Sequence, residues 1–368
     1  MEDKDRIRVG LVGVGSWGRY GHIPALRLLP EYEIVAIASR SGQTATELAT
    51  QFDIPLAFGD FRELVEHPDV DLVVVLPPAP QHAAVVKAAI AAGKDVYCEW
   101  PLTTSTRDSE ELLGLAERAG IRHFVGLQRT VGASSLLLSD LLATRYAGNL
   151  RSVRMHVSMS GFGPTRSKSL EWTLPADNFS HVLSIYGGHF MDMLFHAVGW
   201  PATLNAIVKT QFAEISAGAE PKVRNETPDA VMVMGTLQDG ALFQVHIEGG
   251  KMNQQGLQIE VTGTDGDLEV LNERSFVTKH HDVIRGAQGQ GGSWEEIAIP
   301  ERLLTIPPSD LDVSVQDLAQ LYAAFAKERL SGTKLTRDFN DAVAMHRLID
   351  AIMESSSTSK TISMEAHA

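Results

Sequence analysis

The sequence predicts two domains, a doubly wound parallel α/β sheet followed by an α+β domain with a large, mostly antiparallel open sheet. Three observations lead to this expectation. An apolar run at 7–12 enters a glycine-rich loop, and strand-like and helical runs then alternate to residue 127, as in parallel sheets covered on both faces. From residue 149, strand-like runs follow one another through tight turns, which is typical of antiparallel pairing. We therefore place the domains at 1–127 and 128–368, a division that suits a chain of 368 residues.

The elements of the first domain follow from local patterns. Pro24 interrupts the first helix or restarts it, because proline is tolerated only in a first turn. Gly93 and Gly120 stand where helix C-caps are expected. The later strand-like runs are 34–39, 56–58, 71–76, 95–98 and 123–127, and the helical patterns between them are 44–52, 61–66, 81–92 and 105–119. This order is that of a Rossmann-like domain.

The glycine-rich loop carries the first functional indication. Glycines directly after a strand and before a helix let the backbone turn tightly and approach a pyrophosphate, which then faces the helical amides. A merely structural glycine turn is the alternative, but the strand before the loop and a second strand after the helix favour a dinucleotide site. The candidate contacts are Gly13, Gly15, Ser16, Trp17 and Gly18.

The end of the second strand bears on the choice of cofactor. An acidic residue there would bind the ribose 2′-hydroxyl of NAD, but the chain has Ser39 and Arg40 instead. A hydroxyl and a guanidinium suit a 2′-phosphate, and Arg40 could also stack on adenine. NADP is therefore favoured, while an exposed arginine that tolerates NAD remains the alternative.

Two further strand ends converge on the crevice where open α/β sheets bind ligands. They contribute Pro77, Pro78 and His82 after one strand, and Glu99 and Trp100 after the next. His82 opens a helix, so a capping or loop role for it is equally open. The single cysteine, Cys98, is predicted to be a buried small residue rather than a nucleophile.

The second domain is predicted from strand-like runs that are joined in part by tight turns. Asp239-Gly240 and Asp265-Gly266 are strong hairpin signals. The runs are 151–160, 202–211, 230–237, 241–248, 257–262 and 267–271, and the helical stretches are 134–144, 179–198, 313–330 and 338–354. The serine-rich tail from about residue 355 is expected to fray.

The helix at 179–198 carries the candidate chemistry of this domain. His189, Asp192 and His196 are spaced to share one helix face, which permits a metal site but does not favour one over a buried helix. An acid/base role for His189 is more attractive, because two glycines precede it and permit close ligand approach. A core or capping histidine remains the alternative, and we predict no metal.

Composition excludes several classes of protein. A net charge of −14 argues against a nonspecific nucleic-acid binder, whose affinity depends on surplus lysine and arginine. No apolar run is long enough to cross a membrane, and the first residues do not read as a signal peptide. A single cysteine fits a reducing compartment, so we expect a cytoplasmic protein.

Four segments taken in order resemble the Gfo/Idh/MocA family, named for glucose-fructose oxidoreductase, inositol dehydrogenase and MocA. The segments are Gly13–Gly18, Pro77–His82, Ala92–Pro101 and Gly187–Asp192, and the likeness extends over nearly the whole chain. The resemblance implies an NAD(P)-dependent enzyme that oxidises a carbinol of a sugar or cyclitol, or reduces the matching ketone. It also implies a homodimer or homotetramer formed through the second domain's sheet.

Three positions depart from the family pattern. Trp100 stands where the family has the lysine that hydrogen-bonds the reacting hydroxyl, Ile185 where it has an acid, and Gln128 where it often has asparagine. Glu-Trp at this position is similar to the fungal repressor of the galactose regulon, which has this fold and binds NAD(P) without known turnover. Further similarity to that repressor lies at 227–229, 235–237, 249–251, 263–268 and 346–349.

Two functions follow from this resemblance. In the first, the protein is an oxidoreductase of a sugar, sugar derivative or cyclitol, with His189 as acid/base, Asp192 orienting it and Tyr186 as a weaker second proton donor. Trp100 would form a wall beside the nicotinamide and a platform for a sugar face, or simply fill space. In the second, the protein is a catalytically silent sensor of nucleotide and sugar.

Overall fold

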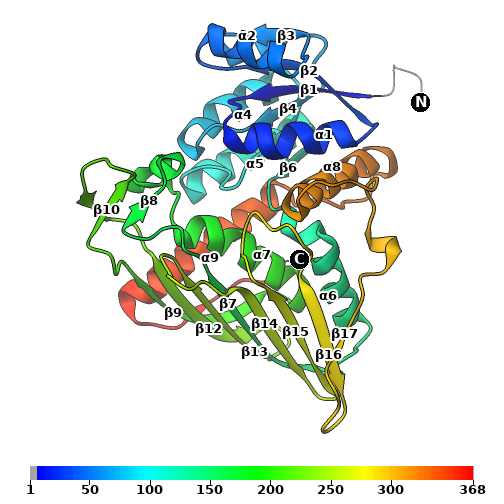
Figure 1. Cartoon of the computed structure of the whole chain (residues 1–368), viewed down its shortest axis with the longest axis vertical. Coiled ribbons are helices and arrows are strands. Elements are labelled where there is room, and N and C mark those ends of the chain that lie inside the picture. Colours follow the sequence, from blue (N-terminus) through cyan, green and yellow to red (C-terminus); the bar gives the residue numbers. More distant parts are fainter. Residues whose placement is uncertain (1–5, 368) are drawn as a thin grey trace. The chain divides into compact units, whose positions relative to one another are not determined.

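The predicted alternation and the later strands form two units in the computed structural model, which describes residues 6–367 (Figure 1). The first unit runs through Val131 and also takes in Thr305–Val343, and the second comprises Gly132–Leu304 and the chain from Ala344. The return of the chain to the first unit brings helix α8 (Val313–Ser331) into its core. The domain boundary predicted at residue 127 instead assigns this helix to the second domain. Helical periodicity in a sequence does not reveal which distant sheet a helix covers.

The sheet of the first unit is entirely parallel, with the strand order β3-β2-β1-β4-β5-β6. This order confirms the predicted Rossmann fold. The strands are β1 (Ile7–Val12), β2 (Tyr32–Ala38), β3 (Leu56–Phe58), β4 (Leu72–Val75), β5 (Asp95–Cys98) and β6 (His123–Val125). The strands β1 and β4, at the centre of the sheet, are almost wholly buried, as expected for a sheet covered on both faces.

Helices cover both faces of this sheet. Side chains of α1, α2 and α8 share one apolar cluster with Val9 and Leu11 of β1. Gly10 faces the other way and lies against Leu64 of α3. The helices are α1 (Ile23–Leu28), α2 (Gly42–Gln51), α3 (Phe61–Glu66), α4 (His82–Ala91) and α5 (Thr106–Ala119). Pro24 lies in the first turn of α1, directly after a π-helical turn at Gly18–His22, so it restarts the helix rather than ending it.

The second unit is built on a nine-stranded sheet with the order β17-β16-β15-β14-β7-β13-β12-β9-β18. All neighbours pair antiparallel except β7 and β13, which are parallel. The strands are β7 (Leu150–Ser158), β9 (Pro201–Lys209), β12 (Ala230–Leu237), β13 (Leu242–Glu248), β14 (Gly256–Gly263), β15 (Gly266–Asn272), β16 (Val283–Gln288), β17 (Glu295–Glu296) and β18 (Ile362–Ser363). The predicted large, mostly antiparallel sheet is thereby confirmed.

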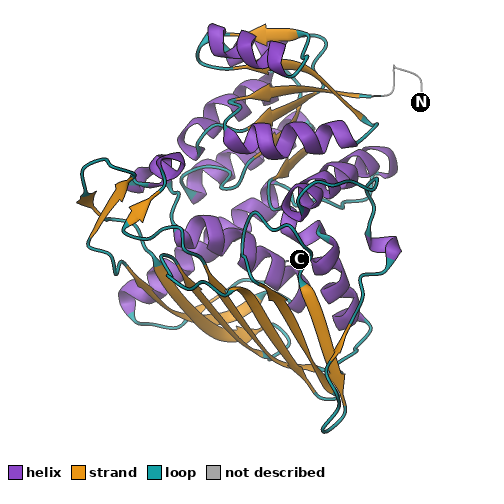
Figure 2. Cartoon of the chain, viewed as in Figure 1, coloured by secondary structure: helices purple, strands orange, loops and turns teal. Residues whose placement is uncertain are grey.

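Helices lie on one face of this sheet and leave the other open (Figure 2). They are α6 (Ala133–Ala143), α7 (Gly188–Val198) and the part of α9 (Phe339–Thr358) from Ala344 onward. In β7, Val153, Met155 and Val157 are buried, whereas the alternate residues Arg154 and His156 face away from this core. A small separate sheet is formed by β8 (Thr165–Arg166), β10 (Glu214–Ala217) and β11 (Val223–Arg224).

Two predicted elements differ in the structure. The helix expected from residue 179 begins later, with a π-helical turn at Leu183–Gly187 that leads into α7, because Phe179 adopts a left-handed backbone conformation. The tail predicted to fray from residue 355 is instead helical to Thr358. It is held there because Ser355 is buried and its hydroxyl accepts a hydrogen bond from the amide of Ala206 in β9.

Candidate functional site

The three glycines of the loop after β1 have three different surroundings. Gly13 has φ of +79°, and a Cβ there would lie 2.9 Å from the backbone nitrogen of Pro77. A Cβ on Gly18 would lie 2.9 Å from a methyl group of Val14, so this glycine allows close packing of the helix. A Cβ on Gly15 would meet none of the described atoms within 4 Å. A tight turn, an open approach and close helix packing are the three requirements of a dinucleotide loop.

The predicted 2′-phosphate residues lie beside this loop. Val12 pairs with Ala38, and the amide of Gly13 donates to the carbonyl of Ala38, so Ser39 and Arg40 follow directly at the same edge of the sheet. Arg40 is exposed, while Ser41 caps α2 by accepting from the amide of Thr44. The structure therefore brings these two residues to the loop, with the guanidinium open to solvent.

The loops after β4, β5 and β6 supply the other predicted cofactor residues. Pro77 packs against Gly13, and Pro78 is exposed at the start of the next turn. His82 is buried, with Nδ1 2.9 Å from the carbonyl oxygen of Pro101 and Nε2 2.6 Å from that of Pro77. Burial lowers the pKa of His82, and its ring joins two loops rather than lying open to a ligand.

Gln128 follows β6 and is 6% exposed. Within residues 6–367, its side-chain Oε1 is buried without a hydrogen-bond partner. An orphaned buried acceptor costs free energy unless a bound group donates to it, so its presence fits the carboxamide or a hydroxyl of a dinucleotide. Together with the open space over Gly15, this residue indicates that the first unit can hold the cofactor.

Glu99 belongs to a buried polar network that the sequence did not indicate. His22 is fully buried, with Nε2 2.8 Å from Glu99 Oε1 and Nδ1 2.8 Å from the hydroxyl of Tyr322. The Tyr97 hydroxyl donates to the same Glu99 oxygen at 2.5 Å. Because a carboxylate only accepts, Nε2 of His22 donates to Glu99. The network fixes the strand end from which Trp100 follows.

The neighbours of Glu99 are both buried. Trp100 is 4% exposed, so much of its indole packs inside the protein. Cys98 is fully buried, which confirms its prediction as a small core residue. Burial, followed by the charge of Glu99, raises the pKa of the Cys98 thiol well above its usual value, and a reactive thiolate is therefore disfavoured.

In the second unit, the predicted catalytic side chains gather around one phenylalanine. The rings of Tyr186 and His189 meet Phe276 edge-on, with centroids 4.6 Å and 5.1 Å away. Asp192 is buried one helical turn after His189. His196 is exposed, in contrast, and lines a hollow with Leu142 and Asp239. The structure thus groups Tyr186, His189 and Asp192 and separates His196 from them.

His181 holds the start of the segment that carries Tyr186 and His189. Its Nδ1 accepts from the amide of Ser184, while its own amide donates to the Ser184 hydroxyl. This reciprocal pair ties His181 to Ser184 at the start of the π-helical turn that carries Tyr186 and leads to His189. Sequence spacing alone gave no sign of this role.

We expect the stability of the protein to fall as the pH drops from about 6.5 to 4. Burial lowers the pKa of His181 and of His346 to about 4. The unfolded chain binds those protons near pH 6.5, so each histidine contributes roughly 1.4 kcal/mol of lost stability per pH unit in that window. Urea unfolding between pH 7 and 4.5 measures this slope. His346→Gln should reduce the slope by the contribution of one proton, roughly 1.4 kcal/mol per pH unit, and exposed His280→Gln should leave the slope unchanged. Equal slopes in all three proteins would contradict this assignment.

The sequence matches two known families over most of its length. Residues 7–127 match the oxidoreductase family with an NAD-binding Rossmann fold, and residues 136–272 match the C-terminal domain of Gal80p.

No helix among the described residues is long and apolar enough to cross a membrane.

Individual relatives align with most of this chain. The chain is 25% identical to the scyllo-inositol 2-dehydrogenase (NADP(+)) IolW of Bacillus subtilis, over 98% of this chain and 97% of that protein. It is 25% identical to the galactose/lactose metabolism regulatory protein GAL80 of Kluyveromyces lactis, over 74% of this chain and 65% of that protein. Levoglucosan dehydrogenase in complex with NADH and L-sorbose superposes with a TM-score of 0.87 at 22% identity, covering 98% and 99% of the two chains. The chain therefore belongs to the Gfo/Idh/MocA family, a family that includes NAD(P)-dependent sugar and cyclitol dehydrogenases and the Gal80 regulators.

Proposed function

We propose that this protein is an NADP-preferring oxidoreductase that interconverts a carbinol and a ketone of a sugar, sugar derivative or cyclitol. The observation that carries the proposal is the glycine loop. Gly13 makes its tight turn, Gly15 leaves open space for the approach of a pyrophosphate, and Gly18 allows close packing of the helix, as dinucleotide binding requires. When bound, the cofactor supplies the hydride chemistry. What remains for the chain is to orient the substrate and move one proton.

His189 is the proposed acid/base. It is the side chain suited to proton transfer near neutral pH, and Phe276 restricts its ring from one side. Asp192, one turn further along the same helix, is proposed to orient it. Tyr186 is proposed as a second donor, since its ring packs against the same phenylalanine. These residues take over the task that the family lysine would perform where this chain has Trp100.

NADP preference gives the first test of the cofactor assignment. Arg40→Ala should weaken NADPH binding at least tenfold, because a 2′-phosphate loses a charge-assisted hydrogen bond worth roughly 1.5–3 kcal/mol. NADH binding should change little, since it lacks that phosphate. Fluorescence titration of both cofactors with wild type and variant measures the difference. Equal or tighter NADH binding by wild type would overturn the preference while leaving the dinucleotide site intact.

A silent sensor of nucleotide and sugar is the second candidate function. Trp100 and Ile185, which replace the family lysine and acid, favour it, as does the match to the Gal80p C-terminal domain. A screen of sugars, sugar acids and cyclitols for NAD(P)H formation separates the two functions. Turnover of any of them supports the enzyme. Tight cofactor binding, a sugar-dependent shift in that binding and no turnover would support the sensor.

We also propose that the open face of the nine-stranded sheet joins copies of this chain. Ile207, Met232, Met234 and Leu242 are exposed on its adjacent strands β9, β12 and β13. Apolar side chains gathered on one face mark an association surface. Met234→Glu should lower the molar mass measured by light scattering to that of one chain, while Met252→Glu, at an exposed loop position, should not. A wild-type protein that is already monomeric would refute the contact.

A further inference from the structure

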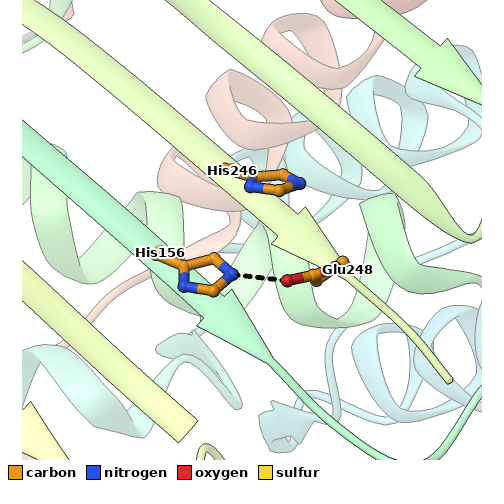
Figure 3. A group of neighbouring side chains, drawn as sticks. All are labelled: His156, His246 and Glu248. Atoms are coloured by element: carbon orange, nitrogen blue, oxygen red, sulfur yellow. Dashed lines mark hydrogen bonds and ion pairs between the residues drawn. The ribbon is translucent and has the colours of Figure 1, made fainter. Parts of the chain in front are cut away.

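Two histidines and a glutamate meet on the outer face of the nine-stranded sheet, away from the helices of that unit (Figure 3). His156 lies on β7 and His246 on β13, and the two residues are direct partners in the parallel pairing of these strands. Their rings stack with centroids 5.0 Å apart and planes 22° apart. Glu248 lies two residues beyond His246 on the same strand and hence on the same face.

The donor atoms of this group already converge. Nε2 of His156 is 2.8 Å from Oε1 of Glu248, and one ligand atom from each of the three residues lies within 4.8 Å of the others. Donors around a tetrahedral zinc ion lie about 3.3 Å apart, given metal–ligand distances near 2.0–2.1 Å. Closing the donors from 4.8 Å to this spacing requires at most about 1.5 Å, which is within reach of side-chain rotation, since all three side chains are half-buried rather than packed in the core.

The strands that carry the two histidines are paired on both sides, and the cross-strand neighbours of the histidines are uncharged. β7 and β13 lie inside the sheet, between β14 and β12, so ladder hydrogen bonds hold both strands on both sides. The cross-strand neighbours are Gln258 beside His156 and Met232 beside His246. One cation competes, because the ammonium of Lys251 is 2.5 Å from Glu248 Oε1.

We propose that His156, His246 and Glu248 bind a divalent transition-metal ion of the zinc class on the outer face of the sheet. Two imidazoles and one carboxylate form a donor set found in zinc proteins, and they leave a coordination position for water. Imidazole donors select zinc, cobalt, nickel or copper over magnesium and calcium, which prefer oxygen ligands. The site is separate from the proposed hydride chemistry and does not depend on it.

Substitutions at Lys251 and at the three ligands should change zinc affinity in opposite directions. The ammonium of Lys251 must leave Glu248 when an ion binds, so Lys251→Gln should tighten zinc binding severalfold. His156→Ala, His246→Ala and Glu248→Gln should each weaken it at least tenfold, because each removes one of three ligands. An ion-pair network without metal affinity predicts that none of these substitutions changes zinc binding.

The experiment uses the full-length protein without a histidine tag, after chelator treatment and dialysis. Isothermal titration with Zn²⁺ should give one ion per chain, and Co²⁺ should develop visible d–d absorption that the His246→Ala variant lacks. His280→Ala, an exposed histidine outside the group, is the matched control and should bind like wild type. Met232 belongs to the proposed association surface, so molar mass is monitored throughout. Absent saturable binding, or equal binding by wild type and His156→Ala, would overturn the proposal.

Discussion

Gly15→Ala is expected to weaken dinucleotide binding by at least tenfold while leaving the free energy of unfolding within about 0.5 kcal/mol of wild type. The added methyl group would meet none of the described atoms within 4 Å, and Gly15 is not among the residues with positive φ. The folded chain therefore accepts alanine at this position. The methyl group would instead occupy the space through which a pyrophosphate approaches the backbone.

Gly93→Ala is the matched control, with the opposite expected pattern. No described atom lies within 4 Å of a Cβ there either, but φ is +68°, a conformation that costs an alanine about 1–2 kcal/mol. This variant should lose stability in urea unfolding and keep its cofactor affinity. If Gly15→Ala bound NADPH and NADH as wild type does, the loop would not be the pyrophosphate site.

Much of the first unit was predictable because the interactions that determine it join residues close together in sequence. The order of strand and helix, the tight turn at Gly13 and the burial of Cys98 follow from residues that are near one another in sequence. The pattern at 313–330 predicted helix α8, but it could not show that the helix packs in the core of the first unit, because the residues it contacts there are far away in sequence. His22 and Tyr322 were missed for a similar reason, since they meet only when segments 300 residues apart come together.

Register explains what the sequence could not reveal in the second unit. His156 and His246 are ordinary outward-facing residues on separate strands until the pairing of β7 with β13 places them side by side. Conversely, the spacing of His189, Asp192 and His196 suggested one shared face, yet His196 is exposed while the other two are buried. Helical spacing gives the direction of a side chain but not its depth, and His196 lies in the last turn of α7, where the helix reaches the surface.

On a substrate identified by the screen, His189→Ala should lower kcat by 10²- to 10⁴-fold, the range typical of lost general acid–base catalysis. KM should change much less, because the proposed role concerns a proton that moves in the transition state. Steady-state kinetics with saturating cofactor measures both quantities. The pH profile of kcat/KM should also lose the limb that His189 produces, which a merely structural role would not remove.

His196→Ala is the matched control, since it lies two turns further along the same helix but is exposed, whereas His189 is buried. It should retain wild-type kcat. Phe276→Leu provides a graded comparison, because it keeps an apolar neighbour beside His189 but removes the edge-on ring contact. If proton transfer depends on the position of the imidazole, this variant should lie between wild type and His189→Ala in kcat. Wild-type kinetics in His189→Ala would remove the histidine from the mechanism and direct attention to Tyr186, whose ring packs against the same phenylalanine.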